Sequence, residues 1–366
     1  MIYPPLNGGE GRIFNLLRGL SKRYRISIMV PRQDNREEEY RAAAMELQHG
    51  LVNKVHLAEE LGQALEQALQ DEKIDIVQFE FHEMGRYARF VRGRVSTIIT
   101  EHDAGFLSWK RSYIRPPVSR YPGESLVNFA WQWLEAARLF RHCDHLVAVS
   151  QTDARLLNRL AARHKIRVVP HGVDLDEFPF RGLARRHAGG VVFVGHYPHY
   201  PNEDAALYLC REIWPLLRQK VPEASLQLIG SFPTQRIMVQ ETRSIQVVGT
   251  VASVEPFLAK ARLFAAPVRL GMGVKGKILE ACASGVPVVA MRRACEGIPE
   301  LRDGRHLMMA DTAQEFAAKA AQLLLDDELS SQLALRAREL VENYYSCDKL
   351  AEGLDRLYQE ILRRRQ

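Results

Sequence analysis

Residues 265–291 read AAPVRLGMGVKGKILEACASGVPVVAM, and their pattern indicates the fold class most clearly. A short apolar run ends at Pro267, a loop with glycines follows, and a segment with helical periodicity stops at Gly285, just before Pro287. Gly directly after a helix and Pro two residues later are the expected signals of a helix end. The stretch therefore predicts a strand, a glycine-rich loop and a helix, in that order.

The rest of the chain repeats this alternation of short β-branched runs and longer helical patterns, which is typical of parallel α/β layers. Predicted strands occupy residues 25–30, 74–79, 96–100, 145–149, 166–169, 191–194, 225–229, 245–248, 263–266 and 286–290. Predicted helices occupy residues 11–23, 57–70, 125–141 and 204–220. The strands form two consecutive series, so we expect an α/β protein with two doubly wound, Rossmann-like domains. Ligands of such sheets bind beyond the carboxyl ends of the strands, which favours a cleft between the domains as the site.

The length of 366 residues also fits two domains. Residues 174–190 lack periodicity and are rich in glycine and arginine, which is typical of an interdomain linker. We expect an N-terminal domain at 1–178, a linker at 179–190 and a C-terminal domain at 191–345. A helix at 346–366 is the candidate to pack back on the N-terminal domain.

The composition excludes several classes of protein. Apolar residues make up 46% and charged residues 26%, as in soluble globular proteins rather than disordered or fibrous ones. The sequence contains no apolar run long enough to span a membrane and no apolar centre of a signal peptide near its start. The five cysteines are scattered and form no C-x-x-C pair, which disfavours a disulfide framework or a zinc site and favours the cytoplasm. The net charge is +6, and the sequence contains no basic arm or tail, so we expect no nucleic-acid partner.

Residues 104–123, AGFLSWKRSYIRPPVSRYPG, carry four cations and no acid, with aromatic residues between the cations. One interpretation is a solvated loop. The other is a surface that meets anionic lipid headgroups or a phosphate-bearing substrate.

The glycine-rich loop before the predicted helix has the chemistry of a diphosphate site. A helix N-terminus attracts anions through its free N–H groups and its partial positive charge. Gly271 and Gly273 allow a close approach of the backbone, and Arg269, Lys275 and Lys277 add positive charge. A plain glycine-rich turn with a solvated basic face is the alternative.

Glu280 follows Lys277 by three residues and shares one face of the predicted helix with it. A carboxylate there can accept hydrogen bonds from vicinal hydroxyls while the cations hold phosphate. The alternative is an ordinary surface ion pair, which contributes only a few tenths of a kcal/mol.

The stretch resembles the donor-binding signature of GT-B glycosyltransferases of family 4, the retaining, group 1 type. It is most similar to the branch with the pattern P-x-R-x-G-x-G-x-K-x-K-x-L-E. Further motifs agree in order: Tyr3-Pro4-Pro5 with Gly8-Gly9, Asp144 to Ser150, Val169 to Asp174, Phe193-Val194-Gly195 with Pro201-Asn202, Gly249-Thr250-Val251 and Glu296-Gly297-Ile298. The resemblance implies a GT-B fold, in which the C-terminal domain binds a nucleotide-diphosphate sugar and the N-terminal domain binds the acceptor.

The resemblance also implies roles for residues of the C-terminal domain. Arg269 and Lys277, supported by Lys275, match the positions that hold the donor diphosphate, where charge develops as the glycosidic bond breaks. Glu280 matches the glutamate that binds the ribose. Residues that match base, loop or phosphate contacts of the donor are Gly249, Val251, Gly271, Gly273, Gly195 and His196.

In the N-terminal domain the resemblance assigns two further positions. Gly8 and Gly9 match a glycine turn that faces the phosphates. His102 and Asp103 follow a predicted strand, where family members have a group that contacts the transferred sugar or the acceptor; capping of the next helix is the alternative. Glu80 and His82 are weaker candidates of the same kind.

The sequence departs from the family pattern in three places. Met272 stands where many members have the first glutamate of an E-x7-E pair. Gly195-His196 and Asn202 replace the usual Gly-Arg and Lys. Only Met1 and Ile2 precede Tyr3, so the first N-terminal strand is expected to be missing or truncated.

We therefore expect a glycosyltransferase of polysaccharide biosynthesis that moves a sugar from a UDP- or GDP-sugar to a glycan or lipid-linked acceptor, with retention. Front-side displacement needs no enzyme nucleophile, and neither a metal nor another cofactor is expected. The expected location is the cytoplasm, with peripheral contact at the inner face of the membrane through residues 104–123. The alternatives are a nucleotide-sugar epimerase of GT-B build and a catalytically impaired GT-B protein that binds nucleotide or acts as a scaffold. A nicotinamide dehydrogenase is disfavoured because no G-x-G-x-x-G follows a first strand.

Overall fold

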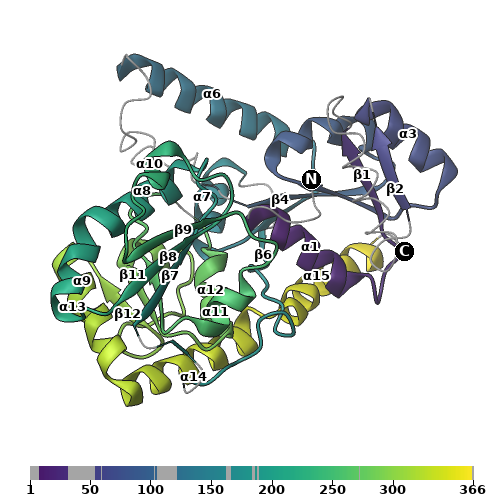
Figure 1. The fold of residues 1–366 in the computed structure, drawn as a ribbon. Coiled ribbons are helices and arrows are strands. Elements are labelled where there is room, and N and C mark those ends of the chain that lie inside the picture. The colour runs from purple at the N-terminus through teal and green to yellow at the C-terminus, as the bar shows by residue number, and fades with distance from the viewer. Residues whose placement is uncertain are drawn as a thin grey trace. The chain divides into compact units, whose positions relative to one another are not determined.

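The computed structural model describes residues 8–31, 54–58, 60–102, 104, 122–161, 166–183, 186–187, 189–271 and 273–364. The chain forms two compact units (Figure 1). The N-terminal unit contains Gly9–His171 together with Cys347–Gln366, and the C-terminal unit contains Gly172–Ser346. The sequence analysis expected the N-terminal domain to end at residue 178, followed by a linker at 179–190, whereas the units divide after His171 and again after Ser346.

The N-terminal unit is built on a parallel four-stranded sheet with the order β3-β4-β5-β6, beside a separate parallel pair, β1-β2. Its strands are β1 (Ser27–Pro31), β2 (Lys54–Ala58), β3 (Ile76–Glu80), β4 (Ser96–Glu101), β5 (His145–Ala148) and β6 (Ile166–Val168). Its helices are α1 (Gly8–Leu20), α3 (Leu61–Asp71), the 3-10 turn η1 (His82–Tyr87), α4 (Ala88–Val91), α6 (Pro122–Phe140), α7 (Gln151–Leu160) and α15 (Cys347–Arg363).

Both faces of this four-stranded sheet are covered, as β-branched runs without a polar face predict. Neighbouring residues of β4 point to opposite sides: Ile98 joins the apolar cluster under α1 and α15, and Ile99 joins the cluster under α4, α6 and α7. The helices α1 and α15 come from opposite ends of the chain and lie side by side (Figure 1). The N-terminal unit is therefore complete only when the last helix is present.

The C-terminal unit has one parallel sheet with the order β12-β11-β10-β7-β8-β9. Its strands are β7 (Gly190–Val194), β8 (Ser225–Ile229), β9 (Ile245–Gly249), β10 (Leu263–Ala266), β11 (Val288–Met291) and β12 (Met308–Ala310). Its helices are α8 (Tyr200–Tyr208), the π-helical turn η4 (Leu209–Ile213), α9 (Trp214–Lys220), α10 (Gln235–Met238), α11 (Glu255–Lys260), α12 (Gly276–Ala283), the 3-10 turn η5 (Arg292–Cys295), α13 (Ala313–Leu325) and α14 (Asp327–Tyr344). If the strands are numbered from β7 as strand 1, the order read from β9 to β12 is 3-2-1-4-5-6, which is the order of dinucleotide-binding folds. In those folds the ligand site lies where the order reverses, here between β7 and β10.

The helix end predicted at Gly285 is confirmed. Gly285 has a φ of +73°, a conformation that side chains disfavour, and its N–H donates to Cys282 O. The next N–H, of Val286, donates to Ala281 O at 2.9 Å, which completes a Schellman motif. The turn directs the chain through Pro287 into β11.

The segment that enters the C-terminal unit is held by one buried arginine. Arg186 donates hydrogen bonds to the carbonyl oxygens of Leu258, Ala261, Arg181 and Ser284, at 2.6–2.8 Å. Leu258 and Ser284 lie at the ends of α11 and α12, where the last carbonyl oxygens of a helix lack N–H donors from a following turn. Burial lowers the pKa of Arg186 to about 10, with the charges of Arg262 and Arg181 acting in the same direction. The guanidinium therefore stays charged at neutral pH.

The sequence missed β2 and β12 and began the helix of residues 57–70 too early, since Lys54–Ala58 is a strand and α3 starts at Leu61. Both missed strands are short, and β12 contains no β-branched residue, so neither has the composition that identifies a strand. The expectation of a missing first strand falls on residues 1–7, outside the described residues.

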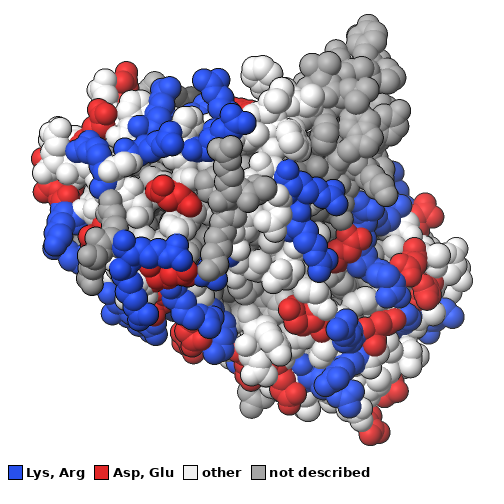
Figure 2. Space-filling model, turned by 180° about the vertical axis from the view of Figure 1, so that it is seen from behind, with Lys and Arg blue, Asp and Glu red and all other residues white. Residues whose placement is uncertain are grey.

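On the face seen in Figure 2, basic and acidic side chains lie side by side over much of the described surface. Such mixing differs from the continuous basic stripe of a nucleic-acid footprint. None of the helices in the described part of the chain combines the length and the apolar character that a membrane crossing needs.

Candidate functional site

The loop between β10 and α12 lies at the point where the strand order of the C-terminal unit reverses. Gly271 and Gly273 have φ values of +84° and +71°, so this loop conformation requires glycine. A Cβ atom at Gly271 would lie 3.4 Å from Pro201 Cγ and 3.6 Å from Lys275 Nζ. The loop is thus in contact with the first turn of α8, and Met272 between the glycines lies outside the described residues.

Lys277 connects this loop to the end of β7. Its Nζ donates to Val194 O at 2.7 Å and to Asn202 Oδ1 at 2.6 Å, and Asn202 Nδ2 donates to His196 O at 2.9 Å. The His196 ring is held in turn by Ser231, with 2.7 Å between Nδ1 and Oγ. An ammonium has three donors, so in the part of the chain that the structure describes these two acceptors leave one N–H for a ligand, with the Phe193 ring centre 4.8 Å from Nζ. The structure therefore links Lys277 to the end of β7 next to Gly195 and, through Asn202, to His196.

Lys277 and Glu280 both have strongly displaced pKa values. Burial lowers the pKa of Lys277 to about 7, and the charge of Lys275 acts in the same direction. Burial raises the pKa of Glu280 to about 7, and the charge of Glu177 adds to the effect. Two groups one helical turn apart thus change charge near neutral pH, and an anionic ligand would favour the protonated lysine.

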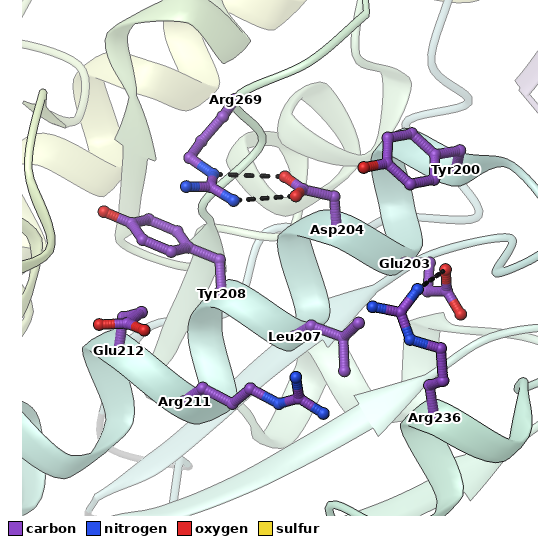
Figure 3. A pocket seen from close by; sticks show the side chains of 9 residues that line it. All are labelled: Tyr200, Glu203, Asp204, Leu207, Tyr208, Arg211, Glu212, Arg236 and Arg269. Carbon is purple, nitrogen blue, oxygen red and sulfur yellow. Dashed lines mark hydrogen bonds and ion pairs between the residues drawn. The ribbon is translucent and has the colours of Figure 1, made fainter. Parts of the chain in front are cut away.

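Arg269 lies apart from the contacts of Lys277. Its Nη2 and Nε pair with Oδ1 and Oδ2 of Asp204 at 2.8 and 3.3 Å, and its guanidinium carbon lies 3.8 Å from the ring centre of Tyr208. Figure 3 shows Arg269 directed at Asp204, at the rim of a pocket of about 290 Å³. In the same pocket Arg236 pairs with Glu203 at 3.1 Å. A phosphate contact by Arg269 would use its remaining N–H groups or replace Asp204.

The carboxyl ends of β8 and β9 form the next part of this edge. Gly249 has a φ of +79° and its carbonyl accepts the N–H of Gly230 at 2.8 Å; Val251 follows, packed against the core. Phe232 was missed by the sequence analysis. It has a φ of +54°, although it is not glycine, and its side chain is 57% exposed, edge-on to His196 at 6.0 Å. The signal was available: an aromatic residue two positions after a strand-end glycine.

The N-terminal unit has its own polar cluster at the carboxyl ends of β3 and β4. His102 Nε2 lies 2.6 Å from Glu80 Oε2, and His82 Nδ1 lies 2.8 Å from Glu101 Oε2. Phe81 stacks on His102 at 4.2 Å between ring centres and has a φ of +70°. Of the candidates, Glu80 and His102 are thus in direct contact, while His82 pairs with Glu101 at the end of β4. Asp103 lies outside the described residues, and Gly8 and Gly9 form the first turn of α1.

Arg12 and His171, which the sequence did not single out, lie beside this cluster. Arg12 is buried, donates to Val169 O at 3.1 Å, and has its Nη1 3.9 Å from Glu80 Oε2. Burial alone would raise the pKa of Glu80, but the hydrogen bond and charge of His102, with the charge of Arg12, lower it overall. Burial lowers the pKa of His171 to about 3, with Arg12 and His102 acting in the same direction. Glu80 is therefore a carboxylate and His171 a neutral imidazole.

Two family matches cover most of the chain. Residues 6–177 match Glycosyltransferase Family 4, and residues 188–326 match Glycosyl transferases group 1. These matches place the chain among the family 4 type glycosyltransferases. The expected family type is confirmed, and the expected two Rossmann-like domains of GT-B build agree with the sheets described above.

This family 4 type glycosyltransferase is similar to solved structures over almost its whole length. The structural match with Anabaena HepE in complex with UDP covers 97% of this chain and 96% of that chain, with a TM-score of 0.70 and 14% identity. A glycosyltransferase from Rickettsia africae ESF-5 gives a TM-score of 0.68 at 13% identity, with 98% and 96% covered. At such low identity the likeness shows the fold, and it confirms the GT-B class.

Among curated proteins, the N-acetyl-alpha-D-glucosaminyl L-malate synthase of Bacillus anthracis is 35% identical over 89 residues. The match spans 24% of this family 4 type chain and 23% of the synthase. The chain therefore matches less than a quarter of that relative's length.

Proposed function

We propose that this protein transfers a sugar from a nucleotide-diphosphate donor, with UDP as the first nucleotide to test, to a hydroxyl of a glycan or lipid-linked acceptor. The observation that carries the proposal is Lys277 at the start of α12, held against the ends of β7 and α8 where the strand order reverses. Anabaena HepE and the pneumococcal O-GlcNAc transferase GtfA, which share the fold, have both been solved with UDP.

The chemistry follows from where charge develops. When the bond between sugar and diphosphate breaks, negative charge grows on the leaving diphosphate. The free N–H groups at the start of α12 and the cations Lys275 and Lys277 stabilise that charge, and Arg269 can join them if it exchanges Asp204 for phosphate. Glu280 is the proposed acceptor for the ribose hydroxyls, and the edge at Gly249 and Val251 the proposed base subsite. The chain is proposed to belong to the branch whose signature runs from Pro267 to Glu280.

We propose that transfer proceeds with retention and without an enzyme nucleophile. Catalysis then rests on positioning the acceptor hydroxyl and stabilising the leaving group. His102 is the proposed contact to a sugar hydroxyl. Because protein cations supply the positive charge, transfer is expected to need no metal ion, and product formation should persist in EDTA.

A thermal-shift screen of UDP, GDP, ADP and their sugars tests the donor site directly, because a ligand that binds the folded state raises its apparent stability. Product analysis of the best donor with and without acceptor follows. Transferred sugar supports the proposal, whereas isomerised free donor indicates an epimerase. Nucleotide binding without transfer or hydrolysis indicates a scaffold.

We further propose that the acceptor lies at an anionic membrane surface of the cytoplasm. The basic aromatic segment at residues 105–121 lies outside the described residues, but α6, which follows it, exposes Trp131 and Leu134 at 67% and 63%. Indole rings favour the membrane interface, and cations favour anionic lipid. Binding to phosphatidylglycerol vesicles should be salt-sensitive and should be lost when Lys110 and Arg111 are neutralised. Equal binding to neutral vesicles would contradict this.

A further inference from the structure

The His102 ring is held on two sides by neighbouring groups. Its Nε2 lies 2.6 Å from Glu80 Oε2, and its flat face stacks on Phe81 at 4.2 Å. Phe81 has a φ of +70°, a conformation that costs a non-glycine residue free energy; residues strained in this way cluster at functional sites. The described residues offer no hydrogen-bond partner to His102 Nδ1, and the side chain is 8% exposed. Among the described residues, Nδ1 is therefore the ring nitrogen that remains open to a ligand.

Glu80 is itself held by a chain of hydrogen bonds that reaches the last helix. Gln78 Nε2 lies 2.5 Å from Glu80 Oε1 and 3.2 Å from Thr100 Oγ1, while Gln78 Oε1 accepts the hydroxyl of Tyr358 at 2.6 Å. Gln78 and Glu80 are two residues apart on β3 and so share the face of the sheet that α1 and α15 cover. Tyr358 comes from α15, some 280 residues later in the sequence.

Each member of this chain restricts the next. The Tyr358 hydroxyl bonded to Gln78 Oε1 sets the orientation of the amide, which then directs its N–H groups at Glu80. An amide turned the other way would set its carbonyl oxygen against the Glu80 carboxylate. An ionised carboxylate only accepts hydrogen bonds, so the His102 nitrogen that faces it must carry a proton.

We propose that Tyr358, Gln78 and Glu80 position His102, so that Nε2 keeps its proton and Nδ1 presents a lone pair to a hydroxyl of the sugar substrate. This assigns positioning roles to residues of β3 and α15, and the substrate part of it rests on the proposed sugar transfer. This series of hydrogen bonds explains why the described end of β3 is so polar: Gln78 and Glu80 act through His102 rather than on the substrate. Arg12 Nη1 also lies near the carboxylate, 3.9 Å from Glu80 Oε2.

The first test reads the ring itself, in the full-length protein. The ¹⁵N signals of the His102 ring, assigned with a His102→Gln variant, report which nitrogen carries the proton at mildly alkaline pH. The wild type is expected to show only the Nε2–H form, whereas Glu80→Gln and Tyr358→Phe should also show the Nδ1–H form. Tyr24→Phe is the matched control. The Tyr24 hydroxyl also bonds residues of α15, Asp355 and Gln359, but it is not part of the series of hydrogen bonds that leads from Tyr358 to His102. Signals of Glu80→Gln and Tyr358→Phe identical to wild type would overturn the proposal.

The second test measures transfer with the same variants. Loss of one orienting hydrogen bond should lower kcat of Tyr358→Phe about tenfold, with KM for the nucleotide sugar unchanged and Tyr24→Phe active as wild type. A lower melting temperature with unchanged kcat would mean that Tyr358 is only structural, against the proposal. If the wild type transfers no sugar at all, the proposed function fails, while the ring signals still decide whether the chain positions His102.

Discussion

At the scale of single residues, the candidate donor site depends on two side chains whose charge states are finely balanced. Lys277 and Glu280 both have pKa values near 7, reached from opposite directions through burial. A sequence motif shows the identity and spacing of such residues, but the balance depends on how deeply the fold buries them.

The affinity for UDP should therefore depend on pH. Lys277 binds phosphate in its protonated form, so above pH 7 binding must take up a proton, and Kd should rise by up to about tenfold per pH unit. Below pH 7 Glu280 gains a proton and loses acceptor strength toward the ribose, so affinity should be highest near pH 7. Calorimetric titration between pH 6 and pH 9 measures this dependence.

Lys277→Arg keeps its charge at all these pH values and should remove the alkaline loss of affinity. Lys220→Arg, at an exposed position of α9, is the control and should retain it. A Kd for wild type that stays constant from pH 7 to pH 9 would contradict the assignment of Lys277 to phosphate.

Phe232 is expected to stack on the nucleotide base. Its exposed ring and positive φ place an aromatic face at the carboxyl ends of β8 and β9, and stacking on a base contributes about 1–3 kcal/mol. Phe232→Leu should weaken UDP binding about tenfold. Tyr344→Leu changes an aromatic residue of similar exposure, 55%, on α14 and should leave Kd unchanged. Equal Kd values for both variants would exclude the stacking role.

The resemblance to family 4 glycosyltransferases assigned Lys277, Gly195 and His196 to the donor site, and periodicity predicted the strand and helix ends near which they lie. The partner of Arg269 could not be predicted in the same way. Asp204 lies 65 residues earlier in the sequence, and the ion pair exists because α8 and the β10–α12 loop are neighbours in space. The hydrogen bonds that link Tyr358 to His102 could not be predicted from the sequence for the same reason.

At the scale of elements, the strands with several β-branched or apolar residues were predicted within a few residues, and β8 and β10 at the residues observed. The failures, β2 and β12, are strands whose stability comes from their neighbours rather than from their composition. Elements that depend on tertiary context thus stay beyond prediction from a single sequence.

Arg186 should be a major contributor to the stability of the C-terminal unit. It satisfies four carbonyl oxygens at once, and hydrogen bonds from a charged donor contribute about 1.5–3 kcal/mol each, so Arg186→Met should destabilise by about 3 kcal/mol or more. Urea unfolding monitored by tryptophan fluorescence measures this. Arg211→Met, at an exposed position, should stay within about 0.5 kcal/mol of wild type. A small effect of Arg186→Met would mean that water replaces the guanidinium.

At the scale of the whole molecule, the last helix belongs to the unit formed by the beginning of the chain. Leu350, Leu354, Leu357 and Ile361 form one buried stripe of α15 that packs with Leu16 and Leu20 of α1. Removal of α15 would expose that core, and truncation of a single buried Leu to Ala already costs about 2–5 kcal/mol.

A chain that ends at Ser346 should therefore lose protection in its N-terminal unit only. Hydrogen exchange read by mass spectrometry should show fast exchange in β3, β4 and β5 and native protection in β7 to β12. The UDP affinity should stay unchanged, because the candidate donor site lies within Gly172–Ser346. Uniform loss of protection in both units would show that they fold as one.

The return of the chain also bears on how the protein is made. On the ribosome, residues 9–171 emerge first, yet they must wait for residues 347–363 before α1 finds its partner. The uninterrupted second half can fold as soon as it leaves the exit tunnel, so the order of folding is expected to run opposite to the order of synthesis. During that interval the part of α1 that packs against α15 stays exposed, so we expect the nascent protein to bind chaperones.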